Sequence, residues 1–156
     1  MKGKRLKNKI IRSVLFCCNY NSIRSPMAEG IFKKLIGKKV FVQSVGIFDT
    51  LEVDGFTVRV CNEIDVKLNQ HRVRSLSEVE KQGGFVGSFD LVIPMTEQAL
   101  NEVKKFSRYC SLDIEKWDIE EPRKTDQDIM RTIESYRYTR DLIYKKILNR
   151  FHDLLN

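Results

Sequence analysis

The sequence predicts an α/β protein with a small four-stranded parallel sheet flanked by helices on both faces. Two patterns lead to this prediction. Short apolar runs, each bounded by polar residues or glycine, alternate with longer segments in which apolar residues recur every three or four positions. Strands that alternate with helices form parallel sheets covered on both faces. The length of 156 residues fits one domain with a core large enough to fold unaided.

The first elements follow in order from the N-terminal end. Residues 10–18 are expected to form a strand that is buried on both faces. Ser25 and Pro26 indicate a helix start, because proline loses no hydrogen bond in the first turn and a serine hydroxyl can bond a free N–H. This helix should end near Gly37, and a strand over residues 40–45 should follow it.

The second half of the chain continues the alternation. We expect a helix up to about Leu68, a strand over residues 89–95, a helix over 97–106 and a short fourth strand within 111–117. After a loop to about Thr125, a long last helix should bury one apolar stripe. The stripe consists of Ile129, Ile133, Tyr136, Ile143, Ile147, Phe151 and Leu154.

Charge is concentrated at the N-terminus. The chain carries 28 Lys and Arg against 21 Asp and Glu, and five of the basic residues fall within residues 2–9. We therefore expect a basic, flexible tail over 1–9 and a single domain over 10–156. No apolar run approaches the roughly 20 residues that span a bilayer, and the start lacks the apolar core of a secretory signal. These features favour a cytoplasmic protein with reduced cysteines, and with neither a membrane nor a nucleic acid as partner.

The segment after the first predicted strand carries the chemistry. A strand delivers the Cys18 thiol to a loop that runs into a helix N-terminus, where free N–H groups and the helix dipole favour an anion. The same environment favours a thiolate nucleophile. Arg24 can bind two oxygens of a phosphoryl group with its planar fork. The predicted phosphate-binding loop is Cys18, Asn19, Tyr20, Asn21, Ser22, Ile23, Arg24 and Ser25.

The stretch from Val14 to Glu29 resembles the low-molecular-weight protein tyrosine phosphatase family, in particular its bacterial members, which shares its fold with arsenate reductases. Weaker matches continue at residues 42–46, 63–65, 71–74, 89–96 and 136–141. The resemblance implies that Cys18 forms a phosphocysteine intermediate while Arg24 clamps the phosphoryl oxygens. It also implies four residues that hold the loop in shape, namely Asn21, Ser25, Ser44 and His71.

The resemblance implies a phosphatase that hydrolyses phosphomonoesters, with phosphotyrosine in proteins as the default substrate and a small phosphomonoester as the other possibility. The loop should bind a phosphate or sulfate ion. No cofactor is implied, and two separated histidines and scattered cysteines make no metal site.

The proton donor is expected in the loop before the last helix, where members of the family place Asp before Pro. Here Glu121 precedes Pro122, so Glu121 is the preferred general acid, and Asp118 is the alternative. Two basic residues, Arg123 and Lys124, follow where eukaryotic members carry tyrosines, which favours a more anionic or differently shaped substrate.

Two other functions compete with the phosphatase. An arsenate reductase needs further cysteines that take over the oxidised state from the first thiol. Apart from Cys17 and Cys18, the chain has only Cys61 and Cys110, which lie 49 residues apart in the sequence. A phosphate- or phosphoprotein-binding module with impaired catalysis is suggested by Tyr20, which stands where the family commonly has glycine, and by the missing Asp-Pro pair. Ile23 also replaces a second cysteine that can protect the nucleophile as a disulfide.

Overall fold

Three parallel strands form the sheet, in the order β2-β1-β3. The structure, a computed structural model, describes residues 9–81, 83–108 and 111–155. The strands are β1 (Ser13–Cys18), β2 (Phe41–Gly46) and β3 (Leu91–Pro94). Because β1 lies in the middle, it is hydrogen-bonded on both sides, and all of its residues after Ser13 are buried. The predicted α/β class with a parallel sheet is confirmed.

The prediction of a fourth strand was wrong. Residues 111–117 pair with β3 through one isolated bridge, Val92 with Ile114. The N–H and C=O of Val92 bond to the residues on either side of Ile114, at 2.9 and 3.0 Å, and the carbonyl of Pro94 accepts from Trp117 N–H at 2.9 Å. The next bond of a regular ladder would need an N–H on Pro94, which proline lacks. The segment therefore runs beside the sheet without becoming a strand of it.

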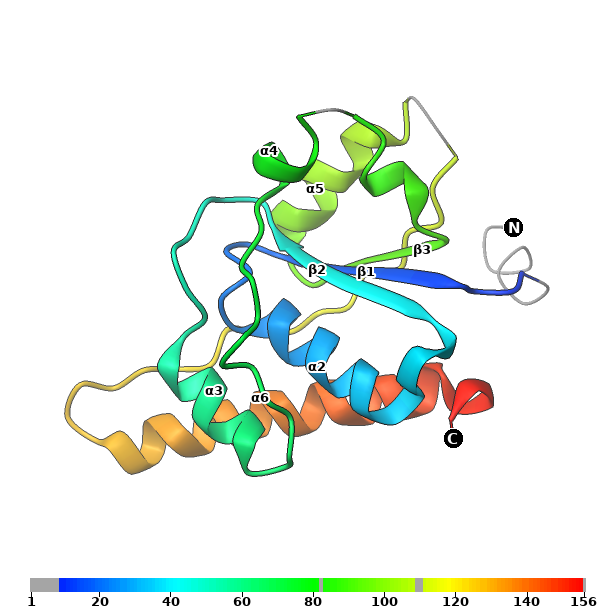
Figure 1. Ribbon diagram of the computed structural model, residues 1–156. Coiled ribbons are helices and arrows are strands. Elements are labelled where there is room, and N and C mark those ends of the chain that lie inside the picture. Colours follow the sequence, from blue (N-terminus) through cyan, green and yellow to red (C-terminus); the bar gives the residue numbers. More distant parts are fainter. Residues whose placement is uncertain (1–8, 82, 109–110, 156) are drawn as a thin grey trace.

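Helices cover both faces of the sheet (Figure 1). On one face lie α2 (Arg24–Ile36), α3 (Gly55–Asn62) and α6 (Ile129–Arg150), while α4 (Leu76–Val79) and α5 (Glu97–Phe106) lie on the other. Short 3-10 helices span Gly37–Lys39, Val86–Ser88 and His152–Leu154. In the described part of the chain, no helix is long and apolar enough to cross a membrane.

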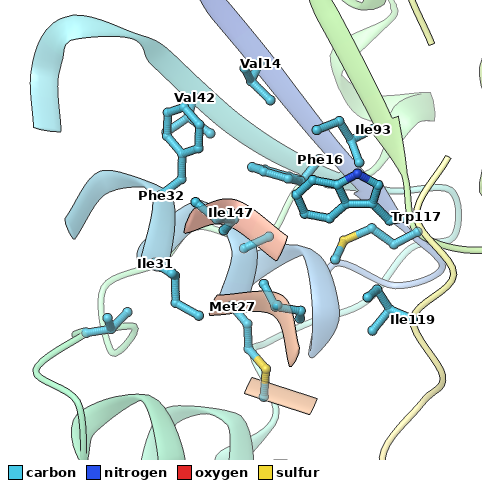
Figure 2. Packing of buried hydrophobic residues seen from close by; sticks show 14 of the residues in the cluster. Val14, Phe16, Met27, Ile31, Phe32, Val42, Ile93, Trp117, Ile119 and Ile147 are labelled. Atoms are coloured by element: carbon cyan, nitrogen blue, oxygen red, sulfur yellow. The ribbon is translucent and has the colours of Figure 1, made fainter. Parts of the chain in front are cut away.

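The core is divided by the sheet, because successive side chains of β1 point to opposite faces. Phe16 packs between Phe32 of α2 and Trp117, with ring centroids 6.0 and 5.7 Å away (Figure 2). Cys18 belongs to this same cluster, whereas Cys17 belongs to the cluster on the α5 face. The two neighbouring cysteines therefore point away from each other.

Helices α3 and α6 each differ from expectation in one respect. Helix α3 ends at Asn62 rather than near Leu68, because Asp65 takes a left-handed φ of 62° and the Val66 N–H turns back to the carbonyl of Cys61. In α6, Ile129 is exposed although the stripe from Ile133 to Ile147 is buried.

Most of the predicted basic tail falls on residues 1–8, which lie outside the described residues. Lys9, its last member, is described. Its Nζ donates to the backbone carbonyl of Asp90 and to the carboxylate of Asp113.

Candidate active site

One cavity of about 200 Å³ opens at the carboxyl end of β1, where a parallel sheet usually binds its ligand. It lies at the point where the chain leaves β1 and enters α2. Its lining combines the predicted loop with two other segments: Cys18, Tyr20, Ser22, Ile23 and Arg24 from the loop, Thr50 and Asp54 from the segment after β2, and Glu121 and Lys124 from the segment before α6.

The N-terminus of α2 faces this loop without a side-chain cap. Ile23 occupies the N-cap position, and no acidic residue lies in the first turn. The first N–H groups of the helix are thus not satisfied by a capping side chain, and the positive end of the helix dipole is not offset. The sequence offered two roles for the Ser25 hydroxyl: a hydrogen bond to a free N–H at the helix start, and a hydrogen bond to the Cys18 sulfur. Its Oγ lies 2.9 Å from Cys18 Sγ, which makes it a partner of the thiol.

Cys18 and Arg24 line the same cavity although both are largely buried. One guanidinium nitrogen of Arg24, Nη1, donates to the carbonyl of Ile119 at 3.0 Å. Because Ile119 is itself in the core (Figure 2), this bond fixes the guanidinium and ties the segment before α6 to the phosphate loop.

Asn21 holds the loop from inside. It takes a left-handed φ of 54°, a conformation that asparagine tolerates better than most residues, and it is fully buried. Its Nδ2 donates to the hydroxyls of Ser25 and Ser44, both at 2.8 Å. Its Oδ1 lies 3.0 Å from His71 Nε2 and accepts from the backbone N–H of Arg74 at 3.1 Å. The structure thus brings together the four predicted loop-supporting residues.

Glu29 extends this network, and the sequence analysis gave it no role. Its carboxylate accepts from Ser44 Oγ at 3.1 Å and from Lys33 Nζ at 3.0 Å, and lies 3.3 Å from His71 Nδ1. Burial would raise the pKa of Glu29, but the hydrogen bond and charge of His71, followed by those of Lys33, lower it to about 2. The signal in the sequence was spacing: Glu29 lies four residues after Ser25 and three before Phe32, which places its carboxylate on a buried face of the helix.

Tyr20 fits the loop without strain, although glycine is common at this position in the family. Among the described non-glycine residues, only Asn21 and Asp65 have positive φ. Space for the Tyr20–Asn21 peptide is provided from the other side by Gly46, where a Cβ would lie 2.5 Å from the Tyr20 carbonyl carbon. The half-exposed Tyr20 ring packs against Phe48, with centroids 5.4 Å apart.

The two candidate proton donors are placed differently. Glu121 lines the cavity that contains Cys18. Asp118 does not, because its carboxylate is 87% exposed and pairs with Lys116 at 2.9 Å. Thr50 and Asp54 were missed as cavity residues. For Asp54 there was a signal, since an Asp directly before Gly55-Phe56 at a predicted helix start is a typical N-cap.

Two other described cysteines are poor candidates for thiol chemistry. Burial, followed by the nearby Cys18, raises the pKa of Cys17 well above its usual value. Burial also raises the pKa of Cys61 to about 12. Both thiols are therefore protonated and inert near neutral pH. Cys110, the remaining candidate, lies outside the described residues.

A thiol and a buried guanidinium at an uncapped helix N-terminus, after the central strand of a parallel sheet, define a class: the phosphatases that work through a cysteine. The family model described as low molecular weight phosphotyrosine protein phosphatase matches residues 13–155. The chain therefore belongs to this family.

Individual relatives cover both activities expected from the sequence. A probable low molecular weight protein-tyrosine-phosphatase of Ralstonia solanacearum, EpsP, is 26% identical over 120 residues, which cover 72% of this chain and 79% of EpsP. An arsenate reductase of Staphylococcus aureus strain N315 is 31% identical over 91 residues, covering 58% of this chain and 64% of the reductase, slightly less than two thirds of its length.

The structural comparison adds the YwlE protein of Bacillus subtilis, solved as a mutant. It matches with a TM-score of 0.69 and 27% identity, over 86% of this chain and 93% of YwlE. Another structure of YwlE is described as an arginine phosphatase with a phosphorylated active site serine.

Proposed function

We propose that the protein hydrolyses phosphomonoesters through a phosphocysteine intermediate, with Cys18 as nucleophile, Arg24 as phosphate clamp and Glu121 as general acid. One observation carries the proposal: the thiol, the guanidinium and a carboxyl group line the same cavity. Phosphoryl transfer needs a nucleophile, a cation that stabilises the equatorial oxygens and a proton source for the leaving group, and these three groups supply them.

The reaction has two steps. The Cys18 thiolate attacks phosphorus, the bond from phosphorus to the leaving oxygen breaks, and that oxygen takes the proton of the Glu121 carboxyl. A water molecule then attacks the phosphocysteine, and the Glu121 carboxylate accepts a proton from this water. The phosphorus–sulfur bond breaks, inorganic phosphate is released, and the Ser25 hydroxyl stabilises the returning thiolate from 2.9 Å. Glu121 is favoured over Asp118 because Asp118 does not line the cavity.

Hydrolysis of p-nitrophenyl phosphate tests the proposal. The wild-type protein should turn over this substrate, and Cys18→Ser should abolish turnover while leaving phosphate binding measurable by calorimetry. Wild-type protein that binds phosphate without turnover would show instead that the fold is a phosphate-binding module. The unstrained Tyr20 backbone and the carboxyl group in the cavity both argue against lost catalysis.

The substrate class has two candidates. Phosphotyrosine is the default from the family, and the Tyr20 ring at the cavity rim provides one wall for its ring. Phosphoarginine, a phosphoramidate and not a monoester, is the second candidate: the bond that breaks would join phosphorus to nitrogen, and that nitrogen would take the Glu121 proton. It is favoured by the likeness to YwlE and by two carboxyl groups, Asp54 and Glu121, which line the cavity. Release of phosphate from matched phosphotyrosine and phosphoarginine peptides separates the two candidates.

Arsenate reduction is the weaker reading of the same loop. It would require a second thiol to accept the oxidation from Cys18, and the two other cysteines within the described residues, Cys17 and Cys61, are buried with raised pKa values. Incubation with arsenate, thioredoxin and thioredoxin reductase should therefore consume no more reducing equivalents than a Cys18→Ser control.

A further inference from the structure

An ion pair joins the two segments that line the cavity together with the loop after β1. Lys124 Nζ lies 2.5 Å from Asp54 Oδ2, and both residues line the cavity. Asp54 belongs to the segment after β2, whereas Lys124 lies three residues after Glu121 in the segment before α6. The pair therefore ties the segment that carries Glu121 to the body of the site.

Asp54 is a fixed anchor for this pair. Its Oδ1 accepts from the backbone N–H groups of Phe56 and Thr57 at the start of α3, at 2.9 and 3.2 Å. Its own N–H donates to the carbonyl of Ser22 in the phosphate loop at 3.0 Å. With the Lys124 ammonium, the Asp54 carboxyl group accepts from three donors, and these contacts hold its side chain in place.

Glu121, in contrast, has no hydrogen bond or ion pair of its own among the described residues, so its position depends on the chain around it. Before it, the carbonyl of Ile119 is held by Arg24. After it come the buried Pro122, with its restricted φ, and the Arg123 N–H, which donates to Ser135 Oγ at 2.7 Å. On the C-terminal side of Glu121, the Lys124 ammonium ties this segment to Asp54 in the cavity wall, and it also lies 5.9 Å from the Phe56 ring centroid.

Building on the proposed function, we propose that Lys124 is a positioning residue, whose ion pair with Asp54 holds the Glu121 carboxyl over the leaving oxygen. The proposal concerns one step. Breaking the pair should weaken protonation of the leaving group and leave attack by Cys18 intact, because no part of the pair contacts the thiol or the Arg24 guanidinium among the described contacts.

Two substrates isolate this step. Phenolate is a poor leaving group that needs the proton, whereas p-nitrophenolate is a stabilised anion that leaves without it. Lys124→Met and Asp54→Asn should each lower kcat/KM for phenyl phosphate about threefold to fivefold, the upper part of the range for a half-exposed ion pair, and change kcat/KM for p-nitrophenyl phosphate less than twofold. Asparagine keeps the oxygen that caps α3, so Asp54→Asn removes the pair and retains the cap.

The matched control is Arg123→Met, which removes the same charge from the neighbouring residue and should leave both substrates unaffected. The double variant Lys124→Met with Asp54→Asn should lose no more than either single variant, since both remove one interaction. Lys124→Arg should retain most of the activity on phenyl phosphate.

Three results would overturn the proposal: additive losses in the double variant, equal losses on the two substrates, or the same loss in Arg123→Met. Absence of any Cys18-dependent turnover in the wild type would overturn the proposed function together with it. If the wild type turns over both substrates but the Lys124 and Asp54 variants lose kcat/KM equally on both, only the positioning role would be overturned.

Discussion

The two sides of the cavity are built in opposite ways. On the side of the phosphate loop, Asn21, His71 and Glu29 are almost completely buried and joined by hydrogen bonds. On the side of the acid, Glu121 is exposed and its segment is held to the cavity wall by the half-exposed Lys124. Under the proposed function, the difference means that phosphate binding is preorganised by the folded core, whereas proton delivery depends on a surface segment. Changes on the first side should affect folding as well as rate, and changes on the second side only rate.

The largest effect is expected from Arg24, which belongs to both sides through its bond to Ile119. Arg24→Ala should lower kcat/KM for p-nitrophenyl phosphate by about 10³-fold or more, because the charge on the transferring phosphoryl group loses its stabilising donors. Arg24→Lys keeps the charge without the planar fork and should recover only part of the rate. Recovery of full activity in Arg24→Lys would show that the loop needs a cation of any shape there.

The acid side is tested next by comparing its two carboxyl groups. Glu121→Gln should lower kcat/KM for phenyl phosphate by roughly 10²-fold or more, the range for loss of a general acid, with little change in thermal stability. Asp118→Asn should stay within about twofold, because that side chain points to solvent. The reverse result would mean that the segment refolds around the substrate and that Asp118 is the donor.

On the loop side, Glu29→Gln should act mainly on stability. The pKa of Glu29 falls from 4.5 to about 2 on folding, so its ionised form stabilises the fold above pH 4.5 and this contribution is lost as pH falls toward 2. The full shift corresponds to about 3 kcal/mol. Urea unfolding should therefore show wild type more stable than Glu29→Gln at pH 6, with the difference shrinking through this window. A difference that is constant with pH would assign the stability to packing.

The phosphate loop could be predicted from the sequence because its parts are local. Cys18 and Arg24 are separated by five residues between a strand and a helix, and the chemistry of that arrangement follows from backbone geometry. The cavity wall could not be predicted in the same way. Asp54 and Lys124 meet 70 residues apart in the chain, and their meeting depends on how α3 and α6 pack.

The sheet also depends on a contact that is distant in the sequence. The segment over 111–117 was expected to be a strand, and it does form hydrogen bonds with β3. Pro94 of β3 interrupts the hydrogen-bond ladder. Because this proline lies in the neighbouring strand, the sequence of the segment itself could not predict the interruption. Ile129 was placed on the buried stripe by its spacing alone, although it is exposed together with Met130 at the start of α6.

The smallest effect is expected where the buried network reaches the surface. Lys33 pairs with Glu29 four residues before it in α2, but its side chain is 59% exposed, whereas His71 meets the same carboxylate at 3% exposure. Lys33→Met should therefore cost no more than about 0.5 kcal/mol in urea unfolding, the range for exposed helical pairs, and leave kcat/KM unchanged. His71→Gln should cost more in both measurements, since it removes a contact to Asn21 as well. Equal costs for the two variants would mean that the network is stabilised by charge at its surface, and the contrast between a preorganised loop side and a surface-held acid side would then fail.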